Sequence, residues 1–214
     1  MADDLIGTME GLRRRLAGLP VGQRALVAIA GAPGSGKSTL AEELTISLNR
    51  EVPDRAAVLP MDGYHYDNLV LTAMSRSDRK GAPDTFDVLG LQQMLTRLKS
   101  NAEDSVAVPV FDRSLDMARA AARLVRKQTD LILVEGNYLL CKAPPWSMLL
   151  PFFQLTVLID APEPLLRTRL MSRWLDLGLS QVEARARVQE NDMPNGAYVR
   201  DMSVRPDFVL VADV

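Results

Sequence analysis

The 214-residue sequence is short of several features that mark particular classes of protein. Its one cysteine, Cys141, cannot form an internal disulfide, and with one histidine in the chain no Cys/His spacing suggests a zinc site. The net charge is −2, which disfavours nucleic-acid binding through bulk positive charge. No apolar run approaches the roughly 18 residues of a membrane-spanning helix. We therefore expect a cytoplasmic protein in which Cys141 is an ordinary buried thiol, with neither a nucleic-acid nor a membrane partner.

Residues 1–19 also lack the pattern of a secretory leader, because they are acidic first and basic later. Apolar residues recur in this stretch at helical spacing, which predicts an amphipathic helix packed on the domain. A helix lying on a membrane surface is the weaker alternative. The apolar positions are Leu5, Ile6, Met9, Leu12 and Leu16.

Short apolar runs alternate along the chain with longer helical patterns. Each run is apolar throughout rather than at every second residue, which is typical of strands with both faces covered by helices. This predicts an α/β fold with a mostly parallel, doubly wound sheet, and we expect one domain over residues 1–214. The predicted strands are residues 25–31, 56–62, 106–112, 131–136, 155–160 and 208–213.

Several of the predicted strands end in an acid or a glycine. In open parallel sheets the ligand crevice lies at the carboxyl ends of the strands. A single acid would only terminate its strand, but several on one rim favour a binding site. The residues concerned are Gly31, Asp62, Asp112, Glu135 and Asp160.

The stretch GAPGSGKS, residues 31–38, matches the phosphate-loop pattern G-x-x-x-x-G-K-S. It follows a predicted strand and opens a predicted helix, which is the context that the motif requires. Backbone N–H groups of such a loop surround a phosphate, and the helix N-terminus adds positive charge. We predict that Lys37 contacts the β- and γ-phosphates and that Ser38 binds Mg²⁺. The predicted nucleotide-binding residues are Gly31, Ala32, Pro33, Gly34, Ser35, Gly36, Lys37, Ser38 and Thr39.

The phosphate loop predicts a nucleotide site without defining the reaction. The N-K-x-D motif of GTPases and the long signature motif of transporter ATPases are both absent. A small-molecule kinase therefore leads, with a weak preference for ATP over GTP. A non-kinase P-loop ATPase acting as a regulator is the rival class.

Two acids at predicted strand ends have separate expected roles. Glu135 ends the most apolar strand, where P-loop proteins place an acid near Mg²⁺. Asp62 is predicted to take the proton from an acceptor hydroxyl as the phosphoryl group arrives, a role that a regulatory ATPase does not need. Tyr64, His65 and Asn68 follow Asp62 closely and are predicted to contact the acceptor. The alternative interpretation is an Asp-Gly turn over packed aromatic rings.

Two segments are predicted to cover the rim: a substrate-side cap over residues 63–87 and an arginine-rich helical lid over residues 162–200. In the lid, Arg169 and Arg173 are one turn apart on one helix face, beside an apolar face that includes Leu166, Leu170, Trp174 and Leu177. We predict that both arginines act on the transferred phosphate, although a basic surface helix is the alternative and Arg167 is left open. Ser180–Glu183 forms a predicted capping box after Gly178. Residues 190–201 are interpreted as a helix end and a turn at Pro194, Asn195 and Gly196.

A family resemblance runs through these segments. GAPGSGKST, PMDGYHYDN, RKGAPDTFD, VPVFD and LILVEGNYLL, in that order, resemble the uridine kinase, phosphoribulokinase and bacterial pantothenate kinase family. LIDAPEPLLRTRLMSRW and ENDMPNGAYV extend the resemblance over nearly the whole chain from residue 24. It is closest to a bacterial subgroup labelled fructose transport system kinase or nucleoside kinase-like. It implies a P-loop kinase using ATP and Mg²⁺, with Asp62 as the base, Glu135 assisting Mg²⁺ and Arg173 in the lid. Arg113 stands where pantothenate kinases carry a histidine, which disfavours pantothenate as the acceptor.

The acceptor is the least determined part of the prediction. A nucleoside needs a flat surface, which aromatic residues such as Tyr64 and Tyr138 offer, whereas a phosphorylated sugar needs cations such as Lys80 and Arg113. The acidic excess in this region disfavours an anionic acceptor, so a neutral sugar such as fructose is placed slightly ahead of uridine. A homodimer is left open. The predicted substrate-binding residues are Tyr64, His65, Asn68, Lys80, Asp112, Arg113 and Tyr138.

Overall fold

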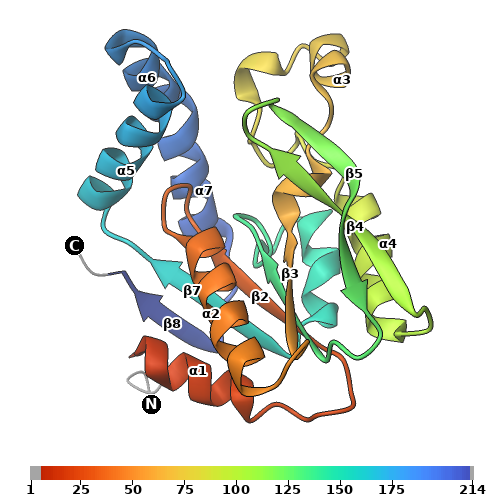
Figure 1. The fold of residues 1–214 in the computed structure, drawn as a ribbon. Helices are drawn as coiled ribbons and strands as arrows, with labels where there is room; N and C mark the ends of the chain where they lie inside the picture. The colour runs from red at the N-terminus through yellow and green to blue at the C-terminus, as the bar shows by residue number, and fades with distance from the viewer. Residues whose placement is uncertain (1–5, 213–214) are drawn as a thin grey trace.

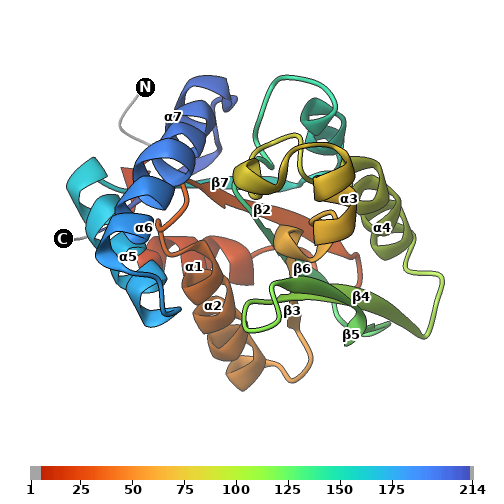
Figure 2. The same cartoon turned by 90° about the horizontal axis from the view of Figure 1, so that it is seen from above.

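The computed structural model describes residues 6–212, which form a six-stranded parallel sheet covered by helices on both faces (Figures 1 and 2). The strand order is β1-β8-β7-β2-β6-β3, and all five neighbouring pairs are parallel. This confirms the predicted doubly wound α/β fold. The strands are β1 Ile6–Gly7, β2 Ala25–Gly31, β3 Ala56–Pro60, β6 Leu131–Glu135, β7 Leu155–Asp160 and β8 Phe208–Val211.

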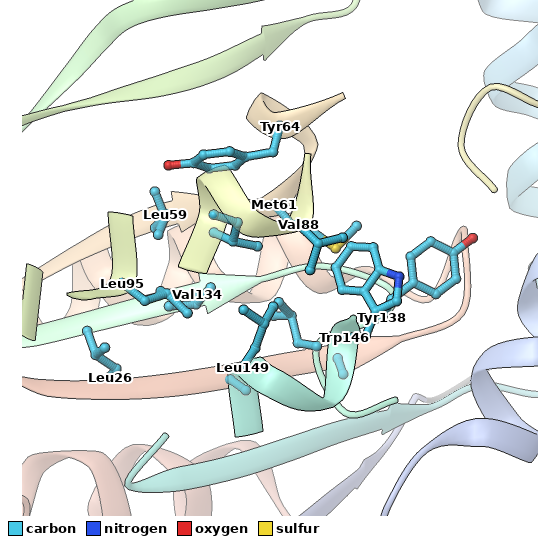
Figure 3. Packing of buried hydrophobic residues seen from close by; sticks show 14 of the residues in the cluster. Leu26, Leu59, Met61, Tyr64, Val88, Leu95, Val134, Tyr138, Trp146 and Leu149 are labelled. Carbon is cyan, nitrogen blue, oxygen red and sulfur yellow. The ribbon is translucent and has the colours of Figure 1, made fainter. Parts of the chain in front are cut away.

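Two apolar cores lie on opposite faces of the sheet, because successive residues of each strand point in opposite directions. Val27 and Ile29 of β2 face the core that includes Leu12 of α1 (Met9–Ala17) and residues of α2 (Lys37–Glu51). Leu26 of β2 faces the core under α4 (Val88–Ser100) and the 3₁₀ helix Trp146–Phe152. Each fully buried leucine contributes roughly 1.5–3 kcal/mol. Figure 3 shows the second core, in which Trp146 and Tyr138 pack beside Leu149.

The N-terminal helix packs on the sheet as predicted, but it begins later. Leu12 and Leu16 of α1 are fully buried, whereas Ile6 belongs to strand β1, which pairs with β8. Leu5 lies outside the described residues. Within residues 6–212 no helix is long and apolar enough to cross a membrane.

The prediction that residues 106–112 join the main sheet is wrong. Strand β4 (Ser105–Asp112) pairs antiparallel with β5 (Met117–Arg126) in a separate two-stranded sheet. Val106 and Val108 are buried in the core, which explains the apolar pattern, while most of β5 is exposed. The hairpin passes close above Gly63, where a Cβ would lie 2.7 Å from the Pro109 carbonyl oxygen. Gly63 is therefore needed for the hairpin to lie over the end of β3.

The cap and the lid stand on either side of the carboxyl edge of the sheet (Figure 1). The cap contains α3 (Asn68–Ala73) and the 3₁₀ helix Ser77–Arg79. The lid contains α5 (Glu163–Asp176) and α6 (Gln181–Arg187), and the predicted Ser180–Glu183 capping box is present.

The predicted turn at residues 194–196 is wrong, because the chain there is helical. A π-helical turn, Val188–Asp192, leads directly into α7 (Met193–Met202). Pro194 is the second residue of α7, directly after the π-helical turn. Gly196 allows a close approach instead of a turn: a Cβ there would lie 3.3 Å from the Ala32 Cβ in the phosphate loop.

Candidate active site

The phosphate loop joins the end of β2 to the start of α2 and has the backbone that phosphate binding requires. Gly34 and Gly36 have φ angles of +80° and +96°, which favour glycine. Gly36 is the N-cap of α2 and has no side chain to cap it, so the first N–H groups of the helix are left for a ligand. The Ser35 hydroxyl is buried without a hydrogen-bond partner among the described residues. An anion in the loop would satisfy these donors.

Lys37 and Glu135 form a buried pair of opposite charge beneath the loop. Lys37 is 8% exposed and donates a 3.0 Å hydrogen bond from Nζ to the Ala32 carbonyl oxygen. Burial lowers the pKa of Lys37, while the carboxylates of Glu135 and Asp62 act in the opposite direction. Burial raises the pKa of Glu135, and Asp62 adds to that shift. Each charge is therefore stabilised by the other.

The chemistry of Ser38 and Glu135 fits Mg²⁺. Both line the same cleft, and both present oxygen atoms, the ligands that Mg²⁺ prefers. Mg²⁺ in P-loop sites uses few protein ligands and completes its shell with phosphate oxygens and water. These two residues are sufficient for a site of that kind.

Asp62 lies on the same rim, at the end of β3. The register pairs Pro60 of β3 with Glu135 of β6, so the residues that follow these positions emerge side by side. The Asp62 side chain is partly exposed to the cleft, and its Oδ2 atom is 3.4 Å from Nη2 of Arg113. Asp62 therefore presents a carboxylate to the cleft beside Arg113.

His65 is clamped between two aromatic rings beside Asp62. Its ring centroid lies 4.1 Å from that of Phe86 and 4.8 Å from that of Phe111. Nδ1 is 2.8 Å from the Asp62 carbonyl oxygen, and since a carbonyl can only accept, Nδ1 carries the proton. Burial lowers the pKa of His65. The neutral ring therefore leaves Nε2 as a hydrogen-bond acceptor.

Lys80 ties the cap to the tip of the β4–β5 hairpin. Its Nζ atom is 2.7 Å from Asn68 Oδ1 and 2.9 Å from Asp116 Oδ2, and Asn68 also donates to Asp116. Burial opposes the charge on Asp116, but the hydrogen bonds from Lys80 and Asn68 hold the pKa of Asp116 below its usual range. These residues close the end of the cleft where Phe111 packs on His65.

The lid arginines face the phosphate loop from α5. Nη1 of Arg169 is 3.5 Å from the Ser35 carbonyl oxygen, which is a long contact. Burial lowers the pKa of Arg173, whose charge lies near those of Arg113, Asp192 and Asp62. Leu166 and Leu170 are buried and dock α5, and Leu170 packs against Gly34. Leu177, predicted on the same apolar face, is 45% exposed beyond the end of α5.

The phosphate loop, Lys37, Glu135, Asp62, His65, Lys80 and the lid arginines line one cleft of about 1180 Å³. The phosphate loop, Lys37 and Arg173 lie along its middle. His65, Phe86 and Phe111 lie toward one end, and Ile159, Leu210 and Ala212 lie toward the other. This volume is slightly above the roughly 300–1,000 Å³ of ordinary ligand pockets.

Comparisons with known proteins agree with this geometry. No family model matches the chain. The sequence is 31% identical over 195 residues to "Putative uridine kinase C227.14" of Schizosaccharomyces pombe, covering 88% of this chain and 83% of that protein. It is 34% identical over 182 residues to a pantothenate kinase of Sorangium cellulosum, covering 80% of this chain and 58% of that protein. A crystal structure from Silicibacter sp. TM1040, described as a "putative fructose transport system kinase", has a TM-score of 0.86 at 38% identity and covers 97% of this chain and 100% of that one.

The chain belongs to the uridine kinase, phosphoribulokinase and pantothenate kinase family of P-loop small-molecule kinases. It is therefore a phosphotransferase that acts on an alcohol group. The kinases of this family use ATP, generally with Mg²⁺. This assignment replaces the rival hypothesis of a non-kinase P-loop ATPase that acts as a regulator.

Three residues predicted to contact the substrate of the kinase lie elsewhere. Tyr64 and Tyr138 are buried at the edge of the apolar core (Figure 3), and the Tyr138 hydroxyl donates to the Gly81 carbonyl oxygen at 2.6 Å. Asp112 is held within the hairpin turn by the hydroxyl and N–H groups of Ser114. Each of these residues was predicted to contact the substrate because it lies close in sequence to a motif. Closeness in sequence does not define the direction of a side chain. Asp160 likewise is exposed and does not line the cleft.

The remaining predicted residues are brought together by the fold. Asp62, His65, Lys80, Arg113, Arg169 and Arg173 line the cleft with the phosphate loop, Lys37, Ser38 and Glu135, and Asn68 supports Lys80 from behind. Arg167 pairs with Glu163 on the exposed side of α5. Sequence analysis assigned no site role to several polar residues of the cleft, among them Asp116, Asn137, Arg187 and Asp192. Of these four, only Asn137 had a usable signal, since it directly follows a predicted strand.

Proposed function

We propose that the kinase transfers the γ-phosphoryl group of ATP, with Mg²⁺, to a hydroxyl group of a neutral sugar such as fructose. The observation that carries the proposal is the position of Asp62, which faces the cleft from the rim that also holds Lys37 and Glu135. A nucleoside such as uridine is the second candidate. Pantothenate is the third.

The middle of the cleft supports the nucleotide part of the proposal. The N–H groups of residues 31–39 and the Lys37 ammonium group would hold the β- and γ-phosphates. Ser38 and Glu135 would hold Mg²⁺, which neutralises charge on the phosphate oxygens when bound. Arg173, with Arg169 beside it, would stabilise charge that develops on the transferred group.

Asp62 supports the acceptor part. A carboxylate within hydrogen-bond reach of the acceptor hydroxyl takes the proton as the oxygen attacks phosphorus. The neutral His65 ring beside it offers Nε2 to a second hydroxyl group of the acceptor. Asp62 and His65 together therefore suit a molecule with adjacent hydroxyl groups.

The charges at the acceptor end favour a neutral acceptor. Lys80 is paired with Asp116, and Arg113 is paired with Asp62. Lys80 is buried and also held by Asn68, so a substrate phosphate would have to compete with Asp116 for it. The protein from Silicibacter sp. named for fructose transport adds support.

Two aromatic rings keep the nucleoside alternative open. Phe86 and Phe111 line the cleft and could stack on a base, and one relative is named as a uridine kinase. Tyr64 and Tyr138 no longer contribute, because they lie in the core. Both phenylalanines already pack on His65, which leaves less flat surface than a base requires.

A panel assay tests the proposal. ADP release is measured with Mg²⁺–ATP and, one at a time, D-fructose, other hexoses, uridine, cytidine and pantothenate. We expect fructose to raise ADP release above the level without acceptor, and the product to be a sugar phosphate. Stimulation by uridine or cytidine well above any hexose would replace the sugar by a nucleoside. No stimulation by any compound while ATP is bound would contradict all three acceptor proposals.

The setting proposed for the enzyme is the cytoplasm. Cys141 is fully buried, and burial raises the pKa of its thiol to about 12, so it is inert and suits a reducing compartment. A homodimer is proposed as the assembly, and sedimentation of the purified protein tests it: a monomer at micromolar concentration would exclude it.

A further inference from the structure

The helix formed by the π-helical turn Val188–Asp192 and α7, called the lid helix below, binds the backbone of the cap through one of its faces. Nδ2 of Asn191 donates to the Lys80 carbonyl oxygen at 2.9 Å, and Nδ2 of Asn195 donates to the Gly81 carbonyl oxygen at 3.3 Å. Both asparagines are 3% exposed, and their side chains also contact each other. Two buried amides from one helix face are thus directed at two consecutive carbonyl groups.

These two carbonyl groups are held unusually firmly. The Lys80 carbonyl oxygen also accepts from Arg187 at 3.3 Å, and the Gly81 carbonyl oxygen also accepts from Tyr138 at 2.6 Å. Gly81 has a φ of +96°, a conformation that side chains disfavour. Each oxygen therefore uses both of its acceptor positions, and the loop has one fixed path.

The same stretch of helix touches the phosphate loop. Gly196 follows Asn195 directly, and a Cβ at Gly196 would lie 3.3 Å from the Ala32 Cβ and 3.8 Å from the Pro33 Cδ. The contacts with the cap and with the phosphate loop are therefore made by neighbouring residues of one rigid element. The distance between the two halves of the cleft is set there.

The π-helical turn explains how the helix reaches both sides. Val188–Asp192 makes i→i+5 hydrogen bonds, which insert one residue relative to an α-helix. Asn191 in this turn and Asn195 in α7 are four residues apart and point the same way, as their 3.3 Å contact shows. Turns of this kind are rare and occur frequently at functional sites.

The loop that contains Lys80 and Gly81 faces the lid helix on one side and forms the acceptor end of the cleft on the other. The Lys80 side chain extends from it to Asn68 and Asp116, and its ammonium group lies 5.1 Å from the centre of the Phe111 ring that covers His65. A shift of the Lys80 backbone would therefore move the groups proposed to bind the acceptor.

We propose that Asn191 and Asn195 are positioning residues, which fix the acceptor end of the cleft relative to the phosphate loop and so place the acceptor hydroxyl against the γ-phosphate. The inference rests on the assignment of the chain as a kinase, but not on which acceptor it uses. The competing explanation is that the asparagines only stabilise the lid helix.

The test compares the double variant Asn191→Ala/Asn195→Ala with wild type and with Asn49→Ala. Asn49 also donates to a backbone carbonyl group, that of Ala56, but away from the cleft, so it controls for the loss of an amide. The variants are expected to fold, because each cap carbonyl group keeps its second donor. Circular dichroism and thermal unfolding check this, and the single variants replace the double variant if it does not fold.

The first measurement is hydrogen exchange with and without Mg²⁺ and a non-hydrolysable ATP analogue, and it needs no acceptor. In wild type and Asn49→Ala, the analogue should slow exchange in residues 31–39 and also in residues 78–85. In the double variant, protection of residues 31–39 should remain and that of residues 78–85 should be lost. Equal protection of both segments in the double variant would overturn the proposal, and so would loss of both.

The second measurement uses the acceptor that gives the highest turnover in the panel. We expect kcat/KM for that acceptor to fall roughly 10- to 100-fold in the double variant, as small misplacements of substrate do. The dissociation constant for the ATP analogue, measured by calorimetry, should change less than about twofold, a change below 0.4 kcal/mol. Parallel losses for both substrates would indicate only a loosened helix. If no compound in the panel is active, the proposed acceptor is contradicted. The hydrogen-exchange measurement then decides whether Asn191 and Asn195 are positioning residues.

Discussion

The Nη2 atom of Arg113 lies 3.4 Å from the Oδ2 atom of Asp62, so the hairpin tip places a cation over the carboxylate proposed as the base. Both side chains are partly exposed, and such pairs contribute only about 0–1 kcal/mol. An acceptor hydroxyl can therefore displace Arg113 from Asp62 at small cost. Asp62 is shielded before the acceptor arrives and remains available to it.

Replacing Asp62 by asparagine is expected to lower kcat by roughly 10²-fold or more, because asparagine keeps the shape but cannot accept the proton. Binding of Mg²⁺–ATP should persist, since Asp62 lies on the acceptor side. Steady-state kinetics and calorimetry measure the two effects. Asp87→Asn is the control: Asp87 caps α4, and asparagine caps equally well. Loss of ATP affinity with unchanged residual turnover would show that Asp62 binds nucleotide or metal instead.

Replacing Lys37 by alanine should lower kcat by roughly 10²- to 10³-fold, the scale for removing one charge that stabilises a transition state. The fold should survive, because the one hydrogen bond that the structure shows for the Lys37 side chain goes to the Ala32 carbonyl oxygen within the loop. A coupled ADP assay and circular dichroism check both statements. Near-normal turnover in a folded Lys37→Ala protein would remove the basis of the nucleotide site.

Arg173 and Arg167 of α5 provide a matched comparison. Arg173 faces the cleft, whereas Arg167 pairs with Glu163 on the exposed side of the same helix. Arg173→Ala should lower kcat more than it weakens ATP binding, and Arg167→Ala should leave both within about twofold. Equal losses from the two substitutions would mean that α5 contributes only through its general positive charge.

His65 predicts a pH dependence of stability. Because burial lowers its pKa in the folded state, the unfolded chain binds a proton first as the pH falls below about 6.5. The contribution of the neutral ring is thus fully present above pH 6.5 and is lost as the pH falls through the lower folded pKa. The free energy of unfolding should decrease by at most about 1.4 kcal/mol per pH unit in this window.

Urea unfolding between pH 5 and 7.5 measures this contribution, with His65→Asn as the reference. Asparagine can still donate to the Asp62 carbonyl oxygen but does not titrate. The difference in unfolding free energy between wild type and His65→Asn should shrink toward acid pH. A constant difference across the range would contradict a lowered pKa for His65.

The parts of the molecule that sequence predicted well are those specified locally. The phosphate loop needs its glycines, its lysine and a strand before it, and all lie within a few residues of one another. Strands β2 and β6 are apolar throughout because they are buried on both faces, which is visible without knowing their partners. Asp62 and Glu135 followed from the rule that ligands bind at the carboxyl ends of parallel strands.

The parts that were missed depend on distant contacts. Strand β4 has the apolar pattern of a sheet strand, but its partner β5 is polar and exposed, so nothing in either segment shows that they form a separate hairpin. Pro194 and Gly196 suggest a turn until α7 is seen against the phosphate loop. The directions of Tyr64 and Tyr138 are set by the core beneath them, which no neighbouring residue encodes.

The placement of Trp174 gives the kinase an optical reporter. The chain has two tryptophans, and Trp146 is sealed in the core. Trp174 lines the cleft, where its indole N–H donates to Asp192 at 2.6 Å and the guanidinium carbons of Arg173 and Arg187 lie 5.9 Å and 5.3 Å from the ring. A phosphate group that draws Arg173 away changes the electric field at this indole and leaves Trp146 untouched. We therefore expect the fluorescence of Trp174 to change when the cleft is occupied, so that binding can be followed in unlabelled protein.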